Sequence, residues 1–379
     1  MNNRERRAVS RKVAALAVVL LVGVGAVSYG LLLRGEAGQS STQNNPLGQS
    51  VTTSVTSSGS EGSSSSAPYT ETSSLSASTP AQSQTSSTTY SSSSTSPASG
   101  AISHVVVVLM ENEEYGSVIG SPSAPYQNSL ASTYALAADY TGVAHPSLPN
   151  YLALVAGSTF GVTSDCSPAQ CSVPSSTTSV ATLLDAHGLT WKEYAESMPA
   201  PCSQTDSPDG LYVTKHDPFV YFDAITGNTG TGATSAYCNS HVASMTQFYS
   251  DLQAGSLPSY SFITPNTCDD AHSCALAAGD TWLSTFVPKI VNSSSFSSTA
   301  LFIVYDEGSP NDLTGGGGQV PCILVSPFAK PGYVSHATYS HYSLLATVEA
   351  IFGLGNLGRN DATASPMSDM FVARALPTP

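Results

Sequence analysis

The chain has 379 residues, with 26 Asp and Glu against 12 Lys and Arg, and a net charge of −14. This acidic balance argues against a nucleic-acid-binding protein, which needs a basic face. Hydrophobic residues make up 41% of the chain, enough for a full core, and this excludes a wholly disordered protein.

Residues 1–36 predict a membrane anchor. A basic start precedes an uncharged stretch at 13–33, which Arg34 closes. A helix of this length spans the roughly 30 Å hydrocarbon core of a bilayer. The basic flank favours a cytoplasmic N-terminus with the rest of the chain outside. A cleaved signal peptide, which would make the protein secreted, is the alternative, but the length of the stretch favours an uncleaved single-pass anchor.

Residues 37–100 predict a disordered stalk. Ser and Thr account for 35 of the sixty residues at 40–99, so the apolar area is too small to offset the entropy of ordering the chain. Such a composition is typical of an O-glycosylated spacer between a membrane and a folded domain.

Residues 101–379 predict the folded, catalytic part. Taken in chain order, the expected elements are a buried strand at 104–110, helices near 126–135, 148–156, 180–186 and 242–252, strands at 260–264, 300–305 and 322–326, and a helix at 341–352. Alternation of strands and helices indicates one large α/β domain with a mostly parallel central sheet flanked by helices. In such sheets, ligands bind at the carboxyl ends of the strands.

Acidic residues follow three of the predicted strands. They stand, with neighbouring polar residues, as Glu111-Asn112, Asp270 with His272, and Asp306-Glu307. Carboxylate oxygens with an occasional His are ligands of divalent cations such as Zn, Ca, Mg or Mn. Any single group is explained as well by a helix cap or an exposed loop. Three groups at one sheet edge favour a site for one or two cations.

Ser147 is the candidate nucleophile. It stands in HPSLPNY at 145–151, where a loop turns into a helix whose free N–H groups favour an anion. Asn150 could donate a hydrogen bond to a phosphoryl oxygen. The alternative is that Ser147 is a simple helix N-cap followed by Pro149 in the first turn.

These residues belong to a longer series of motifs. The series runs VVVVLMENEEY at 105–115, HPSLPNYLALVAG at 145–157, CDDAHSC at 268–274, GDTWL at 279–283, VYDEG at 304–308 and HYSLLATVEAIFGL at 341–354. The chain thereby resembles the bacterial and archaeal phosphoesterases that include acid phosphatases and phospholipases C, within the alkaline-phosphatase-like superfamily. Six motifs in family order cover 101–355.

The resemblance implies a role for each matching position. Glu111 and Asn112 correspond to a metal-binding pair, and Asp306 and Glu307 to an acidic pair that binds the same metal. Ser147 falls on the nucleophile position and Asn150 on the phosphate-contacting Asn. Asp270 and His272 resemble the second metal site of two-zinc relatives. His341 resembles a further ligand or phosphate contact, and either His272 or His341 would act as general acid. Asp280 receives no firm role.

Departures from the family pattern bear on the substrate. The phospholipase branch reads ENRSFD where this chain has ENEEYG at 111–116, whereas HPSLPNY is closer to the phosphatase branch. The resemblance therefore implies an exported, metal-dependent acid phosphatase that hydrolyses phosphomonoesters through a phosphoserine. A phospholipase C-like phosphodiesterase and a catalytically silent, stalked cell-surface protein are the alternatives. No phosphate-neutralising Lys or Arg is visible near the motifs.

The sequence also predicts disulfide pairs and the positions of the remaining histidines. Spacing predicts local disulfides Cys166–Cys171 and Cys268–Cys274, with Cys202 and Cys238 as a further pair and Cys322 as a buried thiol. His216, His241 and His336 are expected in loops or on the surface, and His145 is ambiguous. The glycines at 315–318 predict a flexible lip beside the site.

Overall fold

An eight-stranded sheet forms the centre of the computed structural model, which describes residues 102–228 and 234–373. The strand order is β5-β4-β6-β1-β7-β8-β2-β9, and β3 and β10 form a separate two-stranded sheet. The strands are β1 (His104–Met110), β2 (Ala135–Ala137), β3 (Tyr140–Thr141), β4 (Trp191–Ala195), β5 (Val242–Ser244), β6 (Tyr260–Thr264), β7 (Thr299–Tyr305), β8 (Cys322–Val325), β9 (Tyr333–Ser335) and β10 (Tyr339–Ser340).

The first strand lies in the middle of the sheet. β1 pairs in parallel with β6 on one side and with β7 on the other, and its Val105–Met110 side chains are at most 1% exposed. A run of β-branched residues suits a strand that is covered on both faces. β8 alone runs antiparallel to its two neighbours, β7 and β2. The predicted class, an α/β domain with a mostly parallel sheet, is confirmed.

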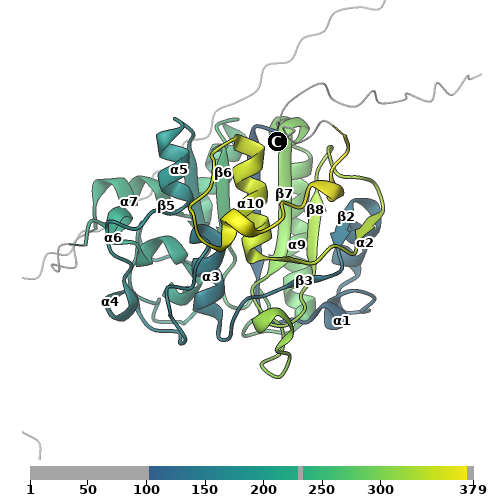
Figure 1. Cartoon of the computed structure of the whole chain (residues 1–379), viewed down its shortest axis with the longest axis horizontal. Coiled ribbons are helices and arrows are strands. Elements are labelled where there is room, and N and C mark those ends of the chain that lie inside the picture. The colour runs from purple at the N-terminus through teal and green to yellow at the C-terminus, as the bar shows by residue number, and fades with distance from the viewer. Residues whose placement is uncertain (1–101, 229–233, 374–379) are drawn as a thin grey trace, which may run out of the picture. The chain divides into compact units, whose positions relative to one another are not determined.

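Helices cover both faces of the sheet. In Figure 1, α3 and α10 lie in front of the strands and α9 runs behind them. The α-helices are α1 (Tyr115–Val118), α2 (Pro125–Thr133), α3 (Ser147–Ala156), α4 (Pro168–Cys171), α5 (Val180–Ala186), α6 (Asp223–Thr226), α7 (Ala236–His241), α8 (Met245–Gln253), α9 (Leu276–Val291) and α10 (His341–Phe352). Single 3₁₀ turns are η1 (Thr214–His216), η2 (Pro218–Tyr221), η3 (Ser294–Ser298), η4 (Thr314–Gly316), η5 (Asn360–Thr363) and η6 (Ser368–Met370).

One predicted helix begins in the wrong place. The expected helix at 242–252 opens with a strand, because Val242–Ser244 pair in parallel with β4 as the edge of the sheet. Ser244 has an extended backbone (φ −76°, ψ 159°), and the helix α8 begins after it at Met245. The predicted helix near 126–135 likewise ends early, at Thr133, where β2 follows.

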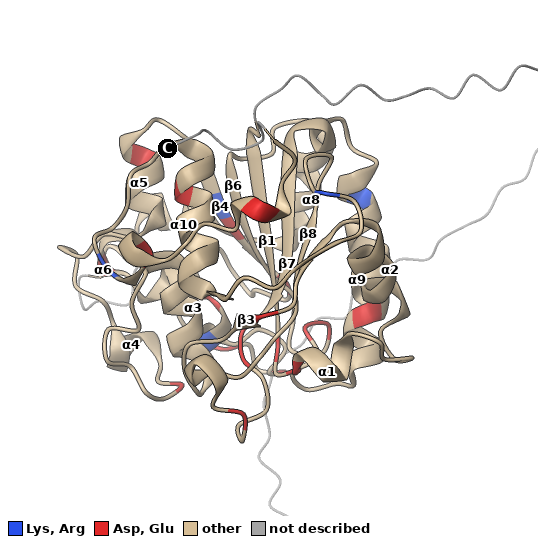
Figure 2. Ribbon diagram, turned by 45° about the vertical axis from the view of Figure 1, so that its right-hand side comes forward, with Lys and Arg blue, Asp and Glu red and all other residues tan. Residues whose placement is uncertain are grey.

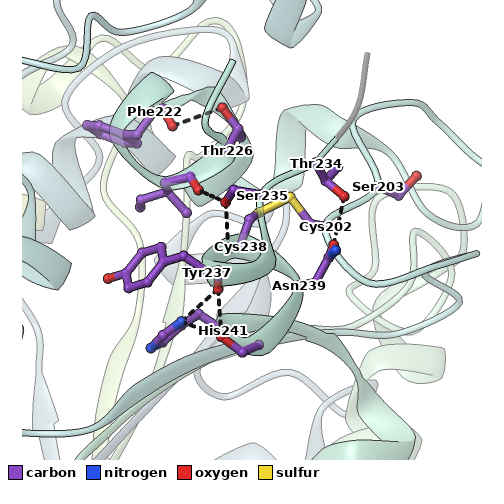
Figure 3. Close-up of a disulfide and its surroundings, with 12 residues drawn as sticks. Cys202, Ser203, Phe222, Thr226, Thr234, Ser235, Tyr237, Cys238, Asn239 and His241 are labelled. Carbon is purple, nitrogen blue, oxygen red and sulfur yellow. Dashed lines mark hydrogen bonds between the residues drawn. A yellow bond between two sulfur atoms is a disulfide. The ribbon is translucent and has the colours of Figure 1, made fainter. Parts of the chain in front are cut away.

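All three predicted disulfides are present. Cys166–Cys171 and Cys268–Cys274 close short loops, and Cys202–Cys238 joins the segment after β4 to α7. Figure 3 shows the last of these, with the start of α7 capped by Ser235, whose hydroxyl accepts a hydrogen bond from the Cys238 amide. Cys322 is a buried free thiol, as expected.

The predicted anchor (1–36) and stalk (37–100) lie outside the described residues. Within residues 102–228 and 234–373, no helix is long and apolar enough to cross a bilayer. The folded elements belong to one compact unit.

Candidate active site

The ends of the central strands bring the predicted acidic residues together. Glu111 follows β1, Asp306 follows β7, and Asp270 lies in the loop after β6. The Glu111 amide donates to the Asp270 carbonyl (2.9 Å), and the Asn112 amide donates to Asp306 Oδ1 (3.1 Å). Figure 2 shows acidic positions gathered at this lower edge of the sheet, between α3 and α1. The edge is where the parallel-sheet rule places a ligand site.

Ser147 opens α3 and points its hydroxyl into this cluster. Its side chain is 1% exposed, and Oγ donates to Glu111 Oε2 at 3.1 Å. Glu111 Oε1 accepts a second hydrogen bond, from the Tyr151 hydroxyl. Pro146, rather than Ser147, holds the N-cap position, and Ser147 makes no capping bond. The simple N-cap interpretation of Ser147 is therefore wrong.

His216 corrects a sequence expectation. It was expected in a loop or on the surface, but its side chain is 1% exposed and lies between two carboxylates. Nε2 is 3.3 Å from Glu111 Oε1, and Nδ1 is 3.2 Å from Asp270 Oδ2. The ring stacks on Tyr151 with centroids 5.3 Å apart. The apolar segment Pro218–Tyr221, which begins two residues later, is buried, and His216 is buried beside it. His336 is exposed as expected.

Several buried polar atoms of the cluster lack hydrogen-bond partners. Within the described residues, these include Asp306 Oδ2, and also His216 Nε2 and Asp270 Oδ2, whose close contacts with Glu111 and with the His216 ring do not have hydrogen-bond geometry. Burial, strengthened by the charge of Glu307, raises the pKa of Asp306 to about 8. Burial also raises the pKa of Asp270 to about 7. It raises the pKa of Glu111 well above its usual range, with the charges of Asp306 and Asp270 adding to the effect. Crowded buried carboxylates of this kind resist ionisation unless a cation lies between them.

The donor set suits a divalent cation. Ligand atoms of Glu111, His216 and His272 all lie within 4.8 Å of one another. Oxygen and imidazole donors together fit zinc or manganese, and the carboxylates alone also fit magnesium or calcium. A cation held by Glu111, His216 and His272 would offset the repulsion among the carboxylates around it. The residues present therefore fit the metal that the sequence predicts.

A lysine that the sequence analysis missed lies beside the cluster. Lys215 Nζ is 3.0 Å from His272 Nε2 and 3.0 Å from Asp165 Oδ2. The expectation that no phosphate-neutralising cation is near the site is therefore wrong. The signal was available: Lys215 is one of six basic residues after Arg34, and it directly precedes His216.

Two predicted site residues face backbone rather than open space. Asn150 Oδ1 accepts from the Val143 and Ala144 amides (2.8 and 3.1 Å), and its Nδ2 donates to the Ala144 and Pro146 carbonyls (2.8 and 3.2 Å). Asn150 thus shapes the loop before Ser147, and its contact with phosphate stays a prediction.

His341 is enclosed in the same way. Its Nε2 is 2.5 Å from the Asp306 carbonyl, and its Nδ1 is 3.0 Å from the Tyr140 hydroxyl. Both ring nitrogens are therefore engaged, and the side chain is fully buried. Burial lowers the pKa of His341 to about 4. The geometry makes His341 a positioning residue for Asp306 and does not support the predicted role as general acid.

The side chains of Asp306 and Glu307 make different contacts. Asp306 faces the cluster, while Glu307 Oε2 pairs with His145 Nδ1 at 2.5 Å. His145 Nε2 bonds in turn to the Asp312 carbonyl (2.9 Å), so this pair ties down the glycine-rich loop. That loop lies close to the site: a Cβ on Gly142 would come within 2.7 Å of the Asp306 carbonyl and 2.8 Å of the Gly317 carbonyl. A metal contact by Glu307 or by the Asn112 side chain stays a prediction.

Asp280, which received no role from the sequence, caps a helix. Its two carboxylate oxygens accept from the Tyr126 and Gln127 amides (3.1 and 2.9 Å) at the start of α2. The GDTWL motif is therefore structural at this position.

Comparison with known proteins is decisive for the family. The model of the Phosphoesterase family matches residues 121–355. The phosphatidylinositol-3-phosphatase of Mycobacterium tuberculosis (strain ATCC 25618 / H37Rv) is 33% identical over 269 residues, which are 71% of this chain and 83% of that protein. The chain belongs to the phosphoesterase family. It is a phosphoric ester hydrolase, as the motifs imply.

A second relative of this phosphoesterase is fungal. The phosphate-repressible acid phosphatase of Penicillium chrysogenum is 32% identical over 278 residues, and the match covers 70% of this chain and 62% of that protein. The phosphoesterase therefore spans about three fifths of the length of this relative.

Solved structures share the fold of the phosphoesterase. One from a study of glycosaminoglycan metabolism by Bacteroides thetaiotaomicron has a TM-score of 0.51 at 10% identity, covering 74% of this chain and 83% of that one. A protein of the alkaline phosphatase superfamily from Vibrio parahaemolyticus has a TM-score of 0.47 at 15% identity and covers 72% of each chain.

Proposed function

We propose that the protein is an exported, metal-dependent acid phosphatase that hydrolyses phosphomonoesters through a phosphoserine at position 147. One observation carries the proposal. The Ser147 hydroxyl lies at the start of α3, bonded to Glu111, inside a buried cluster of carboxylates and imidazoles that fits a divalent cation. A hydroxyl is a weak nucleophile on its own, and this setting supplies both an adjacent base and a place for a metal.

The chain's own residues divide the chemistry as follows. Ser147 Oγ attacks phosphorus and its proton passes to Glu111 Oε2, 3.1 Å away. The bond from phosphorus to the alcohol oxygen breaks as the bond to Oγ forms, and water later hydrolyses the phosphoserine. Glu111, Asp270, Asp306, His216 and His272 would hold the cation, which when bound lowers the pKa of the serine and offsets charge on the phosphoryl oxygens.

Lys215 completes the electrostatics of the proposed reaction. Its ammonium group lies beside His272, where it can neutralise a phosphoryl oxygen that the bound cation does not contact. Preorganised cations aimed at the transferring group supply much of the stabilisation in phosphoryl transfer. Burial and the charge of Lys215 lower the pKa of His272 to about 4, so His272 could give the departing alcohol its proton only in acid and otherwise would serve as a metal ligand.

A phosphomonoester substrate is supported by the relatives. The two described above are named as a phosphatidylinositol-3-phosphatase and an acid phosphatase. The HPSLPNY motif, closer to the phosphatase branch, agrees with them.

Export to the cell surface is the proposed location. Three disulfides form in the folded domain, and such bonds persist in oxidising compartments outside the cytoplasm. The predicted anchor at 13–33 would hold the protein in the cell membrane with the catalytic domain outside, and cleavage there would release it.

The test is hydrolysis of p-nitrophenyl phosphate and bis-p-nitrophenyl phosphate, with and without a chelator. Monoester activity that the chelator removes, and that falls at least about 10³-fold in Ser147→Ala, is expected for a metal-assisted nucleophile. Ser284→Ala, which changes a partly exposed serine of α9, serves as the control. Turnover of the diester alone would favour the phosphodiesterase. Unchanged activity in Ser147→Ala would show that Ser147 is not the nucleophile. Inactivity with every added metal would favour the catalytically silent surface protein.

A further inference from the structure

Asp165 bridges two donors that an incoming phosphate would need. Its Oδ1 accepts from the Leu148 amide at 3.0 Å, and its Oδ2 accepts from Lys215 Nζ at 3.0 Å. Leu148 directly follows Ser147 in the first turn of α3, a helix of 10 residues. An amide at the start of a helix and a nearby ammonium are both favourable contacts for an anion.

The two donors also adjoin the reacting groups. The Leu148 amide belongs to the residue after the proposed nucleophile, and Lys215 Nζ is 3.0 Å from His272 Nε2. The place between the Leu148 amide and Lys215 therefore offers two hydrogen-bond donors to an anion, and the Asp165 carboxylate occupies it.

A carboxylate and a phosphoryl group can exchange at such a site. Each presents two anionic oxygens on one atom, so each can bridge the same pair of donors. The Asp165 side chain is 27% exposed, so its carboxylate can turn toward solvent when another anion arrives. The residues just before it, including Thr163 and Ser164, line a surface cavity of about 420 Å³.

The chain on the other side of Asp165 is tied down. Cys166 is held by its disulfide to Cys171, and its carbonyl accepts from the Tyr221 hydroxyl at 2.7 Å. These contacts fix the backbone on the C-terminal side of Asp165.

We propose that Asp165 is a displaceable occupant of the phosphate subsite, which weakens binding of inorganic phosphate and thereby speeds release of this product. The inference rests on the proposed function for its role in turnover, whereas the competition itself concerns phosphate binding alone. Binding of phosphate must break the contacts of Asp165 with Lys215 and with the Leu148 amide. Removal of the carboxylate leaves both donors free for the ligand.

The experiment measures binding of inorganic phosphate to the full chain by calorimetry, together with product inhibition of p-nitrophenyl phosphate hydrolysis. Asp165→Ala and Asp165→Asn are compared with the wild type. The Asn side chain keeps an oxygen that can accept from the Leu148 amide. Asp165→Asn therefore preserves the start of α3 and replaces Asp165→Ala if that variant does not fold. Both variants are expected to bind phosphate about three- to tenfold more tightly, the range for loss of a partly exposed ion pair. Asp209→Asn removes an exposed carboxylate outside the site and should leave phosphate binding and activity unchanged.

The outcomes separate the two proposals. Unchanged or weaker phosphate binding in both variants overturns the occupant role and makes Asp165 a positioning residue for Lys215, which a lower kcat would also show. If the wild type hydrolyses no phosphate ester but the variants still bind phosphate more tightly, the occupant role of Asp165 is supported and the proposed function is contradicted.

Discussion

Lys215 shows how much one side chain can contribute to this site. The folded part of the chain is strongly acidic, and Lys215 is the basic group that contacts the histidine and carboxylate cluster through His272. The charges of Glu111 and Asp165 raise its pKa against the opposing effect of burial, so the group stays protonated. A permanent cation at this position can bind a phosphoryl oxygen in both the ground state and the transition state.

We expect Lys215→Gln to lower kcat/KM for p-nitrophenyl phosphate by about 10- to 100-fold. A hydrogen bond to a charged group is worth about 1.5–3 kcal/mol, and Gln cannot replace the charge. Lys289→Gln, which changes a lysine packed over Tyr249 at the end of α9, is the matched control. Equal kcat/KM in the two variants would show that Lys215 does not contact the substrate.

At the scale of elements, a buried acid pair connects α10 to the end of α3. Glu349 on α10 is 3% exposed and faces Asp361, whose carboxylate accepts from the Leu357 and Arg359 amides (2.6 and 3.0 Å). The Arg359 side chain in turn donates to the Ala156 carbonyl, where α3 ends. Burial, with the nearby charge of Asp361, raises the pKa of Glu349 from 4.5 to about 8.

This pair predicts a pH-dependent stability. Because the folded pKa of Glu349 is raised, the folded state binds more protons than the unfolded state between about pH 4.5 and 8. The free energy of unfolding should therefore fall as pH rises through this window. Glu349→Gln mimics the protonated form, so its melting temperature relative to the wild type should increase steadily from pH 5 to pH 8. Asp209→Asn should show no such trend, because its pKa is lowered and its titration lies below the window. A constant difference for Glu349→Gln would contradict the assignment.

Elements with strong local signals were predictable. β1 carries a run of β-branched residues, and α10 lies between the cap residues Ser340 and Gly353, so both match their expected bounds. Neither β4 nor α9 was predicted. The β4 sequence mixes Lys and Glu with aromatic residues, and the segment forms a strand because it pairs with β5 and β6. Pairing with β4 also explains why the first residues of the helix expected at 242–252 form the strand β5 instead.

At the scale of the whole molecule, the sheet concentrates negative charge at one edge. Carboxylates from the ends of β1 and β7 and from the loop after β6 meet there while largely buried. Such an arrangement is costly without a cation, because burial and mutual repulsion both disfavour ionisation. The stability of the domain should therefore depend on metal.

We expect zinc, manganese, magnesium or calcium to raise the melting temperature of chelator-treated protein by roughly 5 °C or more for the ion that fits best. A ligand at 100 times its Kd stabilises the folded state by about 2.7 kcal/mol. Asp306→Asn should lose this shift, while its metal-free form should melt no lower than metal-free wild type, because Asn replaces a buried carboxyl group whose ionisation burial disfavours. A wild-type melting temperature that no ion changes would contradict the metal site.

The sequence by itself determined the α/β class, the two local disulfides and most acidic residues of the site. These follow from local periodicity, from short cysteine spacings and from the rule that parallel strands end at one edge. Only the tertiary structure decided the roles of His216, Lys215 and Asp165, which come from segments with no strand or helix signal. It also enclosed His341 and Asn150 among backbone groups. The reason is that a side chain's partners depend on which distant segments pack beside it, and local patterns do not specify that packing.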